Sequence, residues 1–464
     1  MADRSSPRRG PHRASHATSH ATSHATSPRV AVTPSRTAAA QILADLRQGQ
    51  LLDSGFERRT TTLDVRDRRW VQELVWGLLR MRSRLDAMLA TRVRGGLGAV
   101  DPDVIDLLRL GTYQLLAMDS VPPYAAIGQT VELTKARHNV GAGMLVNAVL
   151  RRVDRERTTI EPPAPSDPVE ALALATGHPA WIVARWEARW GLETTRALLE
   201  ANNTPAAVHL RAFGITTTEL AQALADEGVM AEPSPLVPDS LRLPSGVSLT
   251  ELTAYREGRF YVQDPAASLV AAYAHLDEGS VVADLCAAPG GKALELARRA
   301  RFVIASERSP ARLARMQAGF ARLGVTTVLP CLADATAPAL APVDAVLVDV
   351  PCTGTGTYRR HPDARWRLRI SDFAVLGMTQ QTILRAAAAV VRPGGLLIYS
   401  TCSLELEEND EQIASFLRTN PEFVLEPPPD GCVPSEVIDG GFLRVLPHRQ
   451  GTDGAFAARL RRRA

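Results

Sequence analysis

The alternation of short β-rich runs with helical stretches, from about residue 261 onward, constrains the fold of this chain most strongly. The runs cover residues 281–285, 302–306, 326–329, 345–348 and 396–400. Such alternation predicts a doubly wound α/β domain, with a parallel sheet and helices on both faces. Ligands of these sheets bind beyond the carboxyl ends of the strands, so the residues that follow each run are candidates for a functional site.

The first third of the chain has a different pattern. Apolar residues recur at helical spacing within residues 40–46 and 70–78, and the segments 104–116 and 125–153 behave in the same way. Asp101 precedes the third of these helices and is a suitable N-cap, and Pro122 and Pro123 follow that helix as a break. We predict an all-helical domain over residues 36–155.

The chain of 464 residues is too long for a single ordinary core, and composition suggests where it divides. Residues 1–35 are rich in Ser, Thr, Ala, Arg and His and predict a disordered tail. Proline is frequent in residues 158–168, as in a linker, and a helix, a strand and a second helix are expected over 180–200, 208–212 and 218–227. We therefore expect a tail (1–35), a helical domain (36–155), a linker with a small α+β module (156–260) and an α/β domain (261–464).

Cysteine and histidine usage argues against a metal site and against export. The five cysteines are odd in number and lack the short paired spacing of zinc ligands, and His16, His20 and His24 lie in the low-complexity tail. No apolar segment is long enough to span a bilayer, and no secretory h-region follows the first arginines. We expect a cytoplasmic protein with reduced thiols, without metal or membrane contact, and a monomer.

The basic residues are almost all arginine, since lysine occurs only at Lys135 and Lys292. Arginine's planar fork suits phosphate and base contacts, but a coding bias toward arginine explains the same count. With a net charge of only +3, the composition permits RNA binding without indicating it.

Three successive strand ends carry the features of a nucleotide-type cofactor site. The first predicted strand ends in the glycine-containing loop Cys286–Lys292, and a helical pattern begins at Ala293. Glycines let a backbone approach a ligand, and a helix N-terminus attracts an anionic group. Glu307 follows the second strand, where a carboxylate meets ribose hydroxyls, and Asp334 follows the third. We predict a cofactor that contains adenosine.

Two cysteines lie at the ends of the next two strands. The fourth strand ends in Asp349-Val350-Pro351-Cys352 and the fifth in Ser400-Thr401-Cys402-Ser403. A buried cysteine at a strand end is usually an inert apolar residue, but two beside a cofactor site suggest covalent catalysis. A thiolate that adds to C6 of cytosine turns C5 into a carbon nucleophile, which is what methylation at C5 requires.

With these motifs the chain resembles the RsmB (Sun, Fmu) family of ribosomal RNA cytosine-5 methyltransferases, within the group related to Nop2 and NSUN proteins. The resemblance extends from about residue 36 to the end, and Gln263-Asp264, Arg360-His361-Pro362-Asp363 and the final Asp453-Gly454-Ala455-Phe456 also carry it. It implies a NusB-like RNA-binding fold for the helical domain, S-adenosylmethionine as cofactor and ribosomal RNA, of the 16S type, as substrate.

The family's functional residues map onto this chain. The resemblance implies that Cys402 is the nucleophile, that Cys352 assists release of the methylated base, and that Asp349 bonds N3 of the cytosine. The implied contacts of S-adenosylmethionine or its neighbourhood are Cys286, Ala287, Ala288, Pro289, Gly290, Gly291, Lys292, Glu307, Asp334 and Asp349.

The segment 359–367 combines five cationic or imidazole side chains with one indole. This mixture suits phosphates and an unstacked base, and we predict that Arg360, His361, Arg365 and Trp366 line an RNA groove. Three alternatives stay open from the sequence: a non-catalytic RNA-binding module, a DNA cytosine methyltransferase that uses Cys352 as nucleophile, and a small-molecule or protein methyltransferase that needs neither cysteine. The target nucleotide and the form of the RNA substrate, free or assembled, are not predicted.

Overall fold

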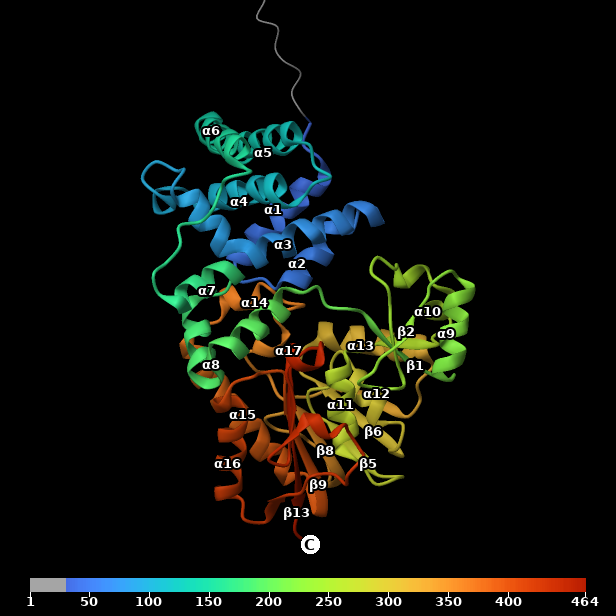
Figure 1. Ribbon diagram of the computed structural model, residues 1–464. Helices are drawn as coiled ribbons and strands as arrows, with labels where there is room; N and C mark the ends of the chain where they lie inside the picture. The colour runs from blue at the N-terminus through green and yellow to red at the C-terminus, as the bar shows by residue number, and fades with distance from the viewer. Residues whose placement is uncertain (1–30) are drawn as a thin grey trace, which may run out of the picture.

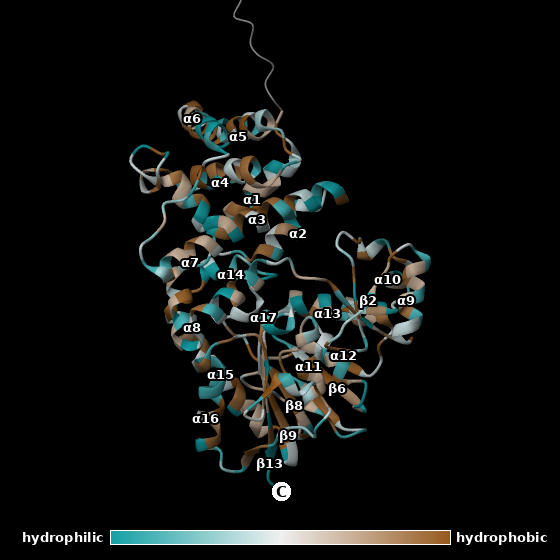
Figure 2. Ribbon diagram, viewed as in Figure 1, coloured by the Kyte–Doolittle hydropathy of each residue, from teal (hydrophilic) through white to brown (hydrophobic). Residues whose placement is uncertain are grey.

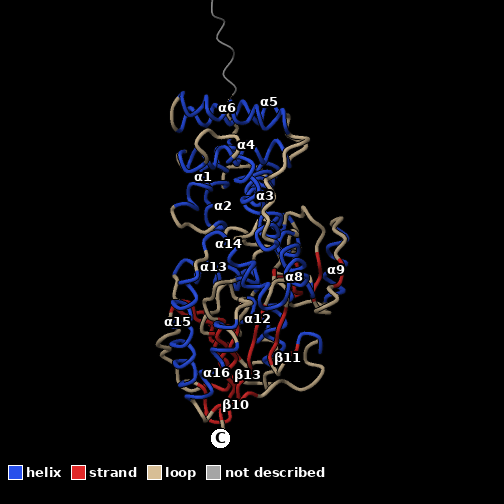
Figure 3. The backbone as a smooth tube through the Cα atoms, turned by 60° about the vertical axis from the view of Figure 1, so that its left-hand side comes forward, coloured by secondary structure: helices blue, strands red, loops and turns tan. Residues whose placement is uncertain are grey.

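The computed structural model describes residues 31–464, so most of the predicted tail lies outside the described residues. Figure 1 shows a helical region at the top, a large α/β region at the bottom and a small α+β module on the right. The backbone trace in Figure 3 places all strands in the lower half and only helices above them. The predicted fold class of helical domain, α+β module and α/β domain is confirmed.

The helical domain is built around one apolar core that includes Ile42, Leu74 and Leu108. Its helices are α1 (Pro34–Arg47), α2 (Leu52–Thr60), α3 (Val65–Ala90), α4 (Pro102–Ala117), α5 (Pro123–Arg137) and α6 (Val140–Glu156). The predicted cap is present, since the Asp101 side chain accepts a hydrogen bond from the backbone N–H of Asp103.

Two sequence boundaries in this domain are corrected. Helix α1 begins at Pro34, inside the predicted tail, because proline is well suited to the first turn of a helix, where no N–H partner is needed. The single helical run expected over 125–153 is two helices, α5 and α6. The helical conformation ends at His138. The side chain of Asn139 then caps α6 by accepting a hydrogen bond from the backbone N–H of Ala142.

The second region combines two parts with different neighbours. The module has a four-stranded antiparallel sheet in the order β2-β3-β1-β4. Its elements are β1 (His209–Ala212), α9 (Thr217–Asp226), β2 (Glu232–Pro233), β3 (Ser240–Arg242), α10 (Thr253–Arg256) and β4 (Phe260–Val262). Helices α7 (Pro168–Thr176) and α8 (Ala180–Asn203), by contrast, share an apolar cluster with Tyr358 and Leu404 of the α/β domain.

The α/β domain contains a nine-stranded sheet in the order β11-β12-β13-β9-β8-β5-β6-β7, with β10 paired to β13. The parallel strands are β5 (Val281–Asp284), β6 (Phe302–Glu307), β7 (Val328–Leu332), β8 (Val343–Asp349) and β9 (Val391–Thr401). The helices are α11 (Pro265–Ala274), α12 (Gly291–Leu296), α13 (Pro310–Leu323), α14 (Ala364–Arg367), α15 (Ile370–Ala389), α16 (Asp410–Thr419) and α17 (Pro447–Gln450). The strands of this sheet are mostly hydrophobic in Figure 2, as buried strands between two helical layers must be.

The expected parallel sheet is thus extended by antiparallel strands. These are β10 (Phe423–Leu425), β11 (Ile438–Asp439), β12 (Phe442–Val445) and β13 (Ala455–Arg462), and β13 pairs with β9 from Phe456 opposite Thr401 to Arg461 opposite Leu396. Antiparallel neighbours need no crossover helix, so the alternating pattern of the sequence ends before them.

The segment 359–367 joins the helical and α/β domains through hydrogen bonds between indole N–H groups and main-chain carbonyls. Trp76 Nε1 donates to the carbonyl of Arg360 (2.9 Å), and Trp366 Nε1 donates to the carbonyl of Leu79 (2.8 Å). In Figure 1 the short helix α14 lies directly below the helical domain. None of the helices in residues 31–464 combines the length and the apolar character needed to cross a membrane.

Candidate active site

The carboxyl ends of the parallel strands bring the predicted residues to one edge of the sheet. Asp284 is the last residue of β5, Glu307 of β6 and Asp349 of β8, and Cys402 follows the last residue of β9. Parallel pairing of β6, β5, β8 and β9 aligns these ends side by side. Residues separated by more than a hundred positions in sequence therefore form one site.

An ion pair occupies the centre of this edge. Lys292 Nζ donates to Asp349 Oδ2 (2.7 Å), and Ser400 Oγ donates to the other carboxylate oxygen, Asp349 Oδ1 (2.7 Å). Burial opposes the charge of Lys292, but Asp349 and Asp284 outweigh it and raise the pKa of the lysine. Both oxygens of Asp349 are held, so its orientation is fixed.

Asp284 is the most unusual carboxyl group of the edge. It is 1 % exposed, and its Oδ2 has no hydrogen-bond partner within residues 31–464. Burial raises the pKa of Asp284 to about 7, with Lys292 acting in the opposite direction. A buried carboxyl oxygen without a partner is costly, which indicates a place where a ligand supplies the missing contact.

The loop 286–292 has less free space at its glycines than the sequence suggested. Gly290 has a φ of +109°, and a Cβ there would lie 2.7 Å from Cε1 of Phe320. A Cβ on Gly291 would lie 2.3 Å from Oε1 of Gln263. Gly290 is thus required by its backbone conformation and by packing, whereas at Gly291 the neighbour is the end of a flexible side chain. Helix α12 after them is only six residues long.

The remaining loop residues and acids differ in burial. Ala287 and Ala288 are buried, Pro289 is exposed, and burial raises the pKa of the Cys286 thiol, which makes this cysteine unreactive. Glu307 is buried, and its carboxylate accepts from the backbone N–H of Ser309 (2.8 Å) and lies 3.2 Å from Arg312.

Asp334 is exposed beyond β7. Its Oδ1 accepts hydrogen bonds from the backbone N–H and from the hydroxyl of Thr336. The bond from the backbone N–H, and to a lesser extent the bond from the hydroxyl, lowers the pKa of Asp334. The carboxylate therefore stays charged and fixed at the rim of the edge.

The two predicted catalytic cysteines are in contact. Cys352 Sγ and Cys402 Sγ lie 3.3 Å apart, and both are free thiols. The hydrogen bond to Cys402, together with burial, raises the pKa of Cys352 well above its usual range. Cys352 therefore keeps its proton in this arrangement.

Glu408, which the sequence analysis did not select, fixes the loop that carries Cys352. This buried carboxylate accepts from the N–H of Thr353 (2.9 Å) and from Nε2 of Gln380 (2.9 Å). In the sequence, Glu408 is one of several acidic residues after the Cys402 motif. Only its tertiary contacts distinguish it from the acidic residues beside it.

A cavity of about 270 Å³ opens beside Cys352. Its walls come from the loop after β8 and from the region of α14 and α15, and they are Cys352, Thr353, Ala364, Arg367, Leu368, Asp372, Val375 and Leu376. An apolar wall next to a thiol and a few polar groups is suited to one planar base.

Comparison with known proteins identifies the family. The model of the 16S rRNA methyltransferase RsmB/F family matches residues 271–461, that of the NusB family residues 33–155, and that of the RsmF/B-like ferredoxin-like domain residues 178–250. The "probable ribosomal RNA small subunit methyltransferase B" of Synechocystis is 33% identical over 92% of this chain and 99% of its own length. The chain belongs to the RsmB/F family.

Two further relatives extend this result over the whole RsmB/F architecture. The protein of the same name from Bacillus subtilis is 32% identical over 93% of this chain and 99% of its own length. The crystal structure of PH0851 covers 93% of this chain and 99% of its own, with a TM-score of 0.78 and 26% identity. This RsmB/F protein is therefore an rRNA methyltransferase with a NusB-type helical domain.

In the segment 359–367 of this RsmB/F protein, two of the side chains that we predicted to line an RNA groove, those of Arg360 and Arg365, have partners inside the chain. Arg365 is 1% exposed, and its guanidinium donates to the carbonyl of Gly177 (3.2 Å) and to Oδ1 of Asn203 (2.9 Å). Arg360 is held by Asp264 (2.6 Å) and Asp453 (2.7 Å). Burial favours such internal pairing because a desolvated guanidinium needs protein acceptors.

The other two predicted RNA contacts also have partners inside the chain. His361 Nδ1 lies 3.3 Å from Oδ2 of Asp53 in α2, and the Trp366 ring packs against the core of the helical domain. The segment joins domains. Arg365 is too deeply buried to contact RNA, whereas the RNA contacts expected of Arg360, His361 and Trp366 stay a prediction. In residues 31–464 no group of three or more Cys, His, Asp or Glu side chains is arranged to hold a metal ion.

Proposed function

We propose that this chain forms 5-methylcytosine in 16S ribosomal RNA, with S-adenosylmethionine as methyl donor and a covalent adduct between Cys402 and C6 of the base. The observation that carries this proposal is the pair of thiols 3.3 Å apart at the sheet edge, beside the Asp349 carboxylate. A methyltransferase that acts on an already nucleophilic atom needs neither thiol.

The edge residues fit S-adenosylmethionine. The unpartnered oxygen of Asp284 and the fixed carboxylates of Glu307 and Asp334 supply acceptors for the hydroxyl and ammonium groups of such a molecule. When bound, S-adenosylmethionine supplies an electrophilic methyl group. Calorimetry on Glu307→Ala should show clearly weaker binding of the cofactor, and unchanged affinity would exclude this residue.

In the first step that we propose, the Cys402 thiolate adds to C6 of the cytosine, and the electron pair of the C5–C6 bond moves to C5. In this proposal the carboxyl group of Asp349 bonds N3 as the ring gains electron density. Cys352 keeps its proton at this stage and stabilises the attacking sulfur as a donor.

In the release step, which follows bonding of C5 to the methyl group, Cys352 takes the C5 proton and the C5–H electron pair restores the C5–C6 double bond. The bond between Cys402 and C6 breaks with its electron pair staying on the sulfur, which restores the aromatic ring. Once Cys402 is a neutral thioether, its part in raising the pKa of Cys352 is removed, while burial, Glu408 and Asp349 still act. Cys352 then loses its proton more readily than before and can act as the base. The same contact thus suppresses Cys352 ionisation before addition and permits it afterwards.

Two experiments test the proposal. Bisulfite sequencing of ribosomal RNA from cells without this protein should lose one 5-methylcytosine signal, and an unchanged pattern would refute the substrate. On a denaturing gel, Cys352→Ala should accumulate protein linked to labelled RNA, and Cys402→Ala should form none. The reverse pattern would assign attack to Cys352, as in a DNA-type mechanism.

A further inference from the structure

A groove of about 690 Å³ lies between the helical domain and the α/β domain. Helices α1, α3 and α4 form one wall, and the region of α14 and the start of α15 forms the other. Arg367 and Asp372 line both this groove and the cavity beside Cys352. The groove therefore adjoins that cavity.

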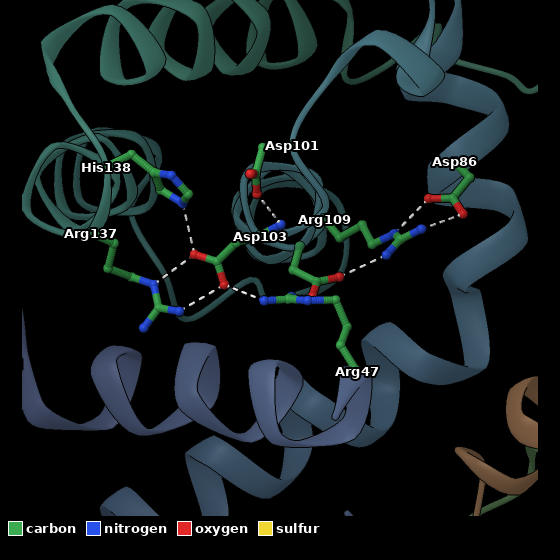
Figure 4. Close-up of polar contacts among 8 residues, drawn as sticks. Arg47, Asp86, Asp101, Asp103, Arg109, Arg137 and His138 are labelled. Carbon is green, nitrogen blue, oxygen red and sulfur yellow. Dashed lines mark hydrogen bonds and ion pairs between the residues drawn. The ribbon is translucent and has the colours of Figure 1, made fainter. Parts of the chain in front are cut away.

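The groove is lined by five arginines and three aspartates, namely Arg47, Arg82, Arg109, Arg367, Arg369, Asp106, Asp363 and Asp372. Three of the arginines already have carboxylate partners. Figure 4 shows Arg47 held by Asp103, and Arg109 held by Asp86 through two hydrogen bonds. Arg367 Nε lies 2.9 Å from Asp363 Oδ2.

Arg82 and Arg369 have no ion-pair partner among residues 31–464. The Arg82 guanidinium stacks over the Trp366 ring, 5.2 Å from its centroid, and the indole is fixed in turn by its bond to the Leu79 carbonyl. Burial and the neighbouring Arg109 lower the pKa of Arg82 to about 10, against the weaker opposite effect of Asp86, so it remains a cation at neutral pH. A half-buried cation without an ion pair is stabilised by an incoming anion.

We propose that this groove binds backbone phosphates of the single-stranded RNA that flanks the target cytosine, with Arg82 as its central contact and Arg369 at its rim. The proposal rests on the proposed function, since a base can enter the Cys352 cavity only when it is unstacked and its neighbours are single-stranded. The excess of arginine over aspartate and the two residues shared with that cavity favour RNA as occupant. Trp366 then acts as a platform for Arg82 rather than for a base.

The test is a salt series on the full-length protein with a single-stranded 16S fragment that contains the cytosine found by bisulfite sequencing. Arg82→Gln should weaken binding about 5- to 10-fold at low salt and reduce the slope of log K against log salt by about 0.7, the loss of one phosphate contact. The KM for RNA should rise while kcat stays within about twofold, because the thiols are untouched.

The matched control is Arg84→Gln, which removes the same charge from the same helix but outside the groove. Arg84 pairs only loosely with Glu161 (3.8 Å), and its substitution should leave the slope unchanged. Arg82→Lys, which keeps the charge, should retain most of the slope even if the loss of the Trp366 contact lowers stability.

A slope that is the same in wild type and Arg82→Gln, or an equal loss in Arg84→Gln, would overturn the groove proposal and point to another occupant. These outcomes differ from a failure of the proposed function. In that case the wild-type protein itself would form no 5-methylcytosine in the fragment.

Discussion

The carboxyl edge of the large sheet and the segment 359–367 are equally rich in charged and polar side chains, but their partners differ. At the edge, one oxygen of Asp284 has no hydrogen-bond partner within residues 31–464, and the thiols of Cys352 and Cys402 contact each other. In the segment, the guanidinium groups of Arg360 and Arg365 donate to carboxylates and carbonyls of other parts of the chain. The sheet edge can therefore accept a ligand, whereas the polar groups of the segment are already paired with other groups of the protein.

This difference shows that the role of an arginine follows from its partners and not from its sequence neighbours. Arg82 lies in a helix without any recognisable motif, and yet it lines the groove without an ion-pair partner among residues 31–464. Substitutions at the edge should therefore affect chemistry and spare the fold, and substitutions in the segment should do the opposite.

The largest effect is expected at the edge. Cys402→Ala should reduce the rate of methyl transfer by about 10⁴-fold or more, because no carbon nucleophile forms at C5 without the attack. The free energy of unfolding, measured by urea denaturation, should stay within about 1 kcal/mol of the wild type because the thiol is only half-buried. A variant that remains active would remove the basis of the comparison.

The segment should respond in the opposite way. Arg365→Met should lower the free energy of unfolding by about 3–5 kcal/mol, because it leaves several buried acceptors without their donor. Arg367→Met is the matched control two residues away. Its side chain is 40% exposed and paired with one carboxylate, so it should cost less than about 1 kcal/mol. Equal losses in both variants would contradict a structural role specific to Arg365.

Much of this arrangement could be predicted from the sequence where local pattern and function coincide. The parallel strands, the Asp101 cap and the convergence of Asp349, Cys352 and Cys402 follow from periodicity and from the rule that strand ends share one edge. The split between α5 and α6 was missed because apolar spacing continues across His138, where only the backbone conformation changes.

The role of the segment 359–367 could not be predicted in this way. Its partners are Gly177, Asn203 and Leu79, which lie more than 150 residues away in sequence, so composition alone could not distinguish internal pairing from RNA binding. The same limit applies to Glu408 and Arg82, whose environments exist only in the tertiary structure.

The titration of Asp284 gives a third test. Its pKa is raised from the usual 3.8 to about 7 by burial, so the folded state retains a proton that the unfolded state has lost. Its contribution to stability therefore falls as pH rises from about 4 to 7. Between pH 5 and pH 8, Asp284→Asn should gain about 3 kcal/mol in unfolding free energy relative to the cofactor-free wild type.

The control for this measurement is Asp334→Asn, at the same edge. The pKa of Asp334 is lowered by its hydrogen bonds to Thr336, so it does not titrate in this range, and its difference from the wild type should be constant with pH. If the difference in unfolding free energy between Asp284→Asn and the wild type is also constant with pH, Asp284 is ionised over the whole range and acts only as a hydrogen-bond acceptor.

The smallest effect concerns the contact between His361 of the segment and Asp53 of α2. Burial opposes the imidazolium, but the hydrogen bond and charge of Asp53 outweigh it and raise the pKa of His361 above 6.5. The pair therefore stabilises the docked domains fully below about pH 6.5 and loses this contribution as pH rises through the folded pKa. Since the two side chains are 41% and 58% exposed, Asp53→Asn should cost at most about 0.5 kcal/mol at pH 5.5 and nothing at pH 8.5.

Thermal melts at both pH values, with the exposed Asp119→Asn as control, measure this difference. A loss that is equal at both pH values would show that Asp53 acts independently of the His361 charge, and the segment would then join the domains through its main-chain and indole contacts alone.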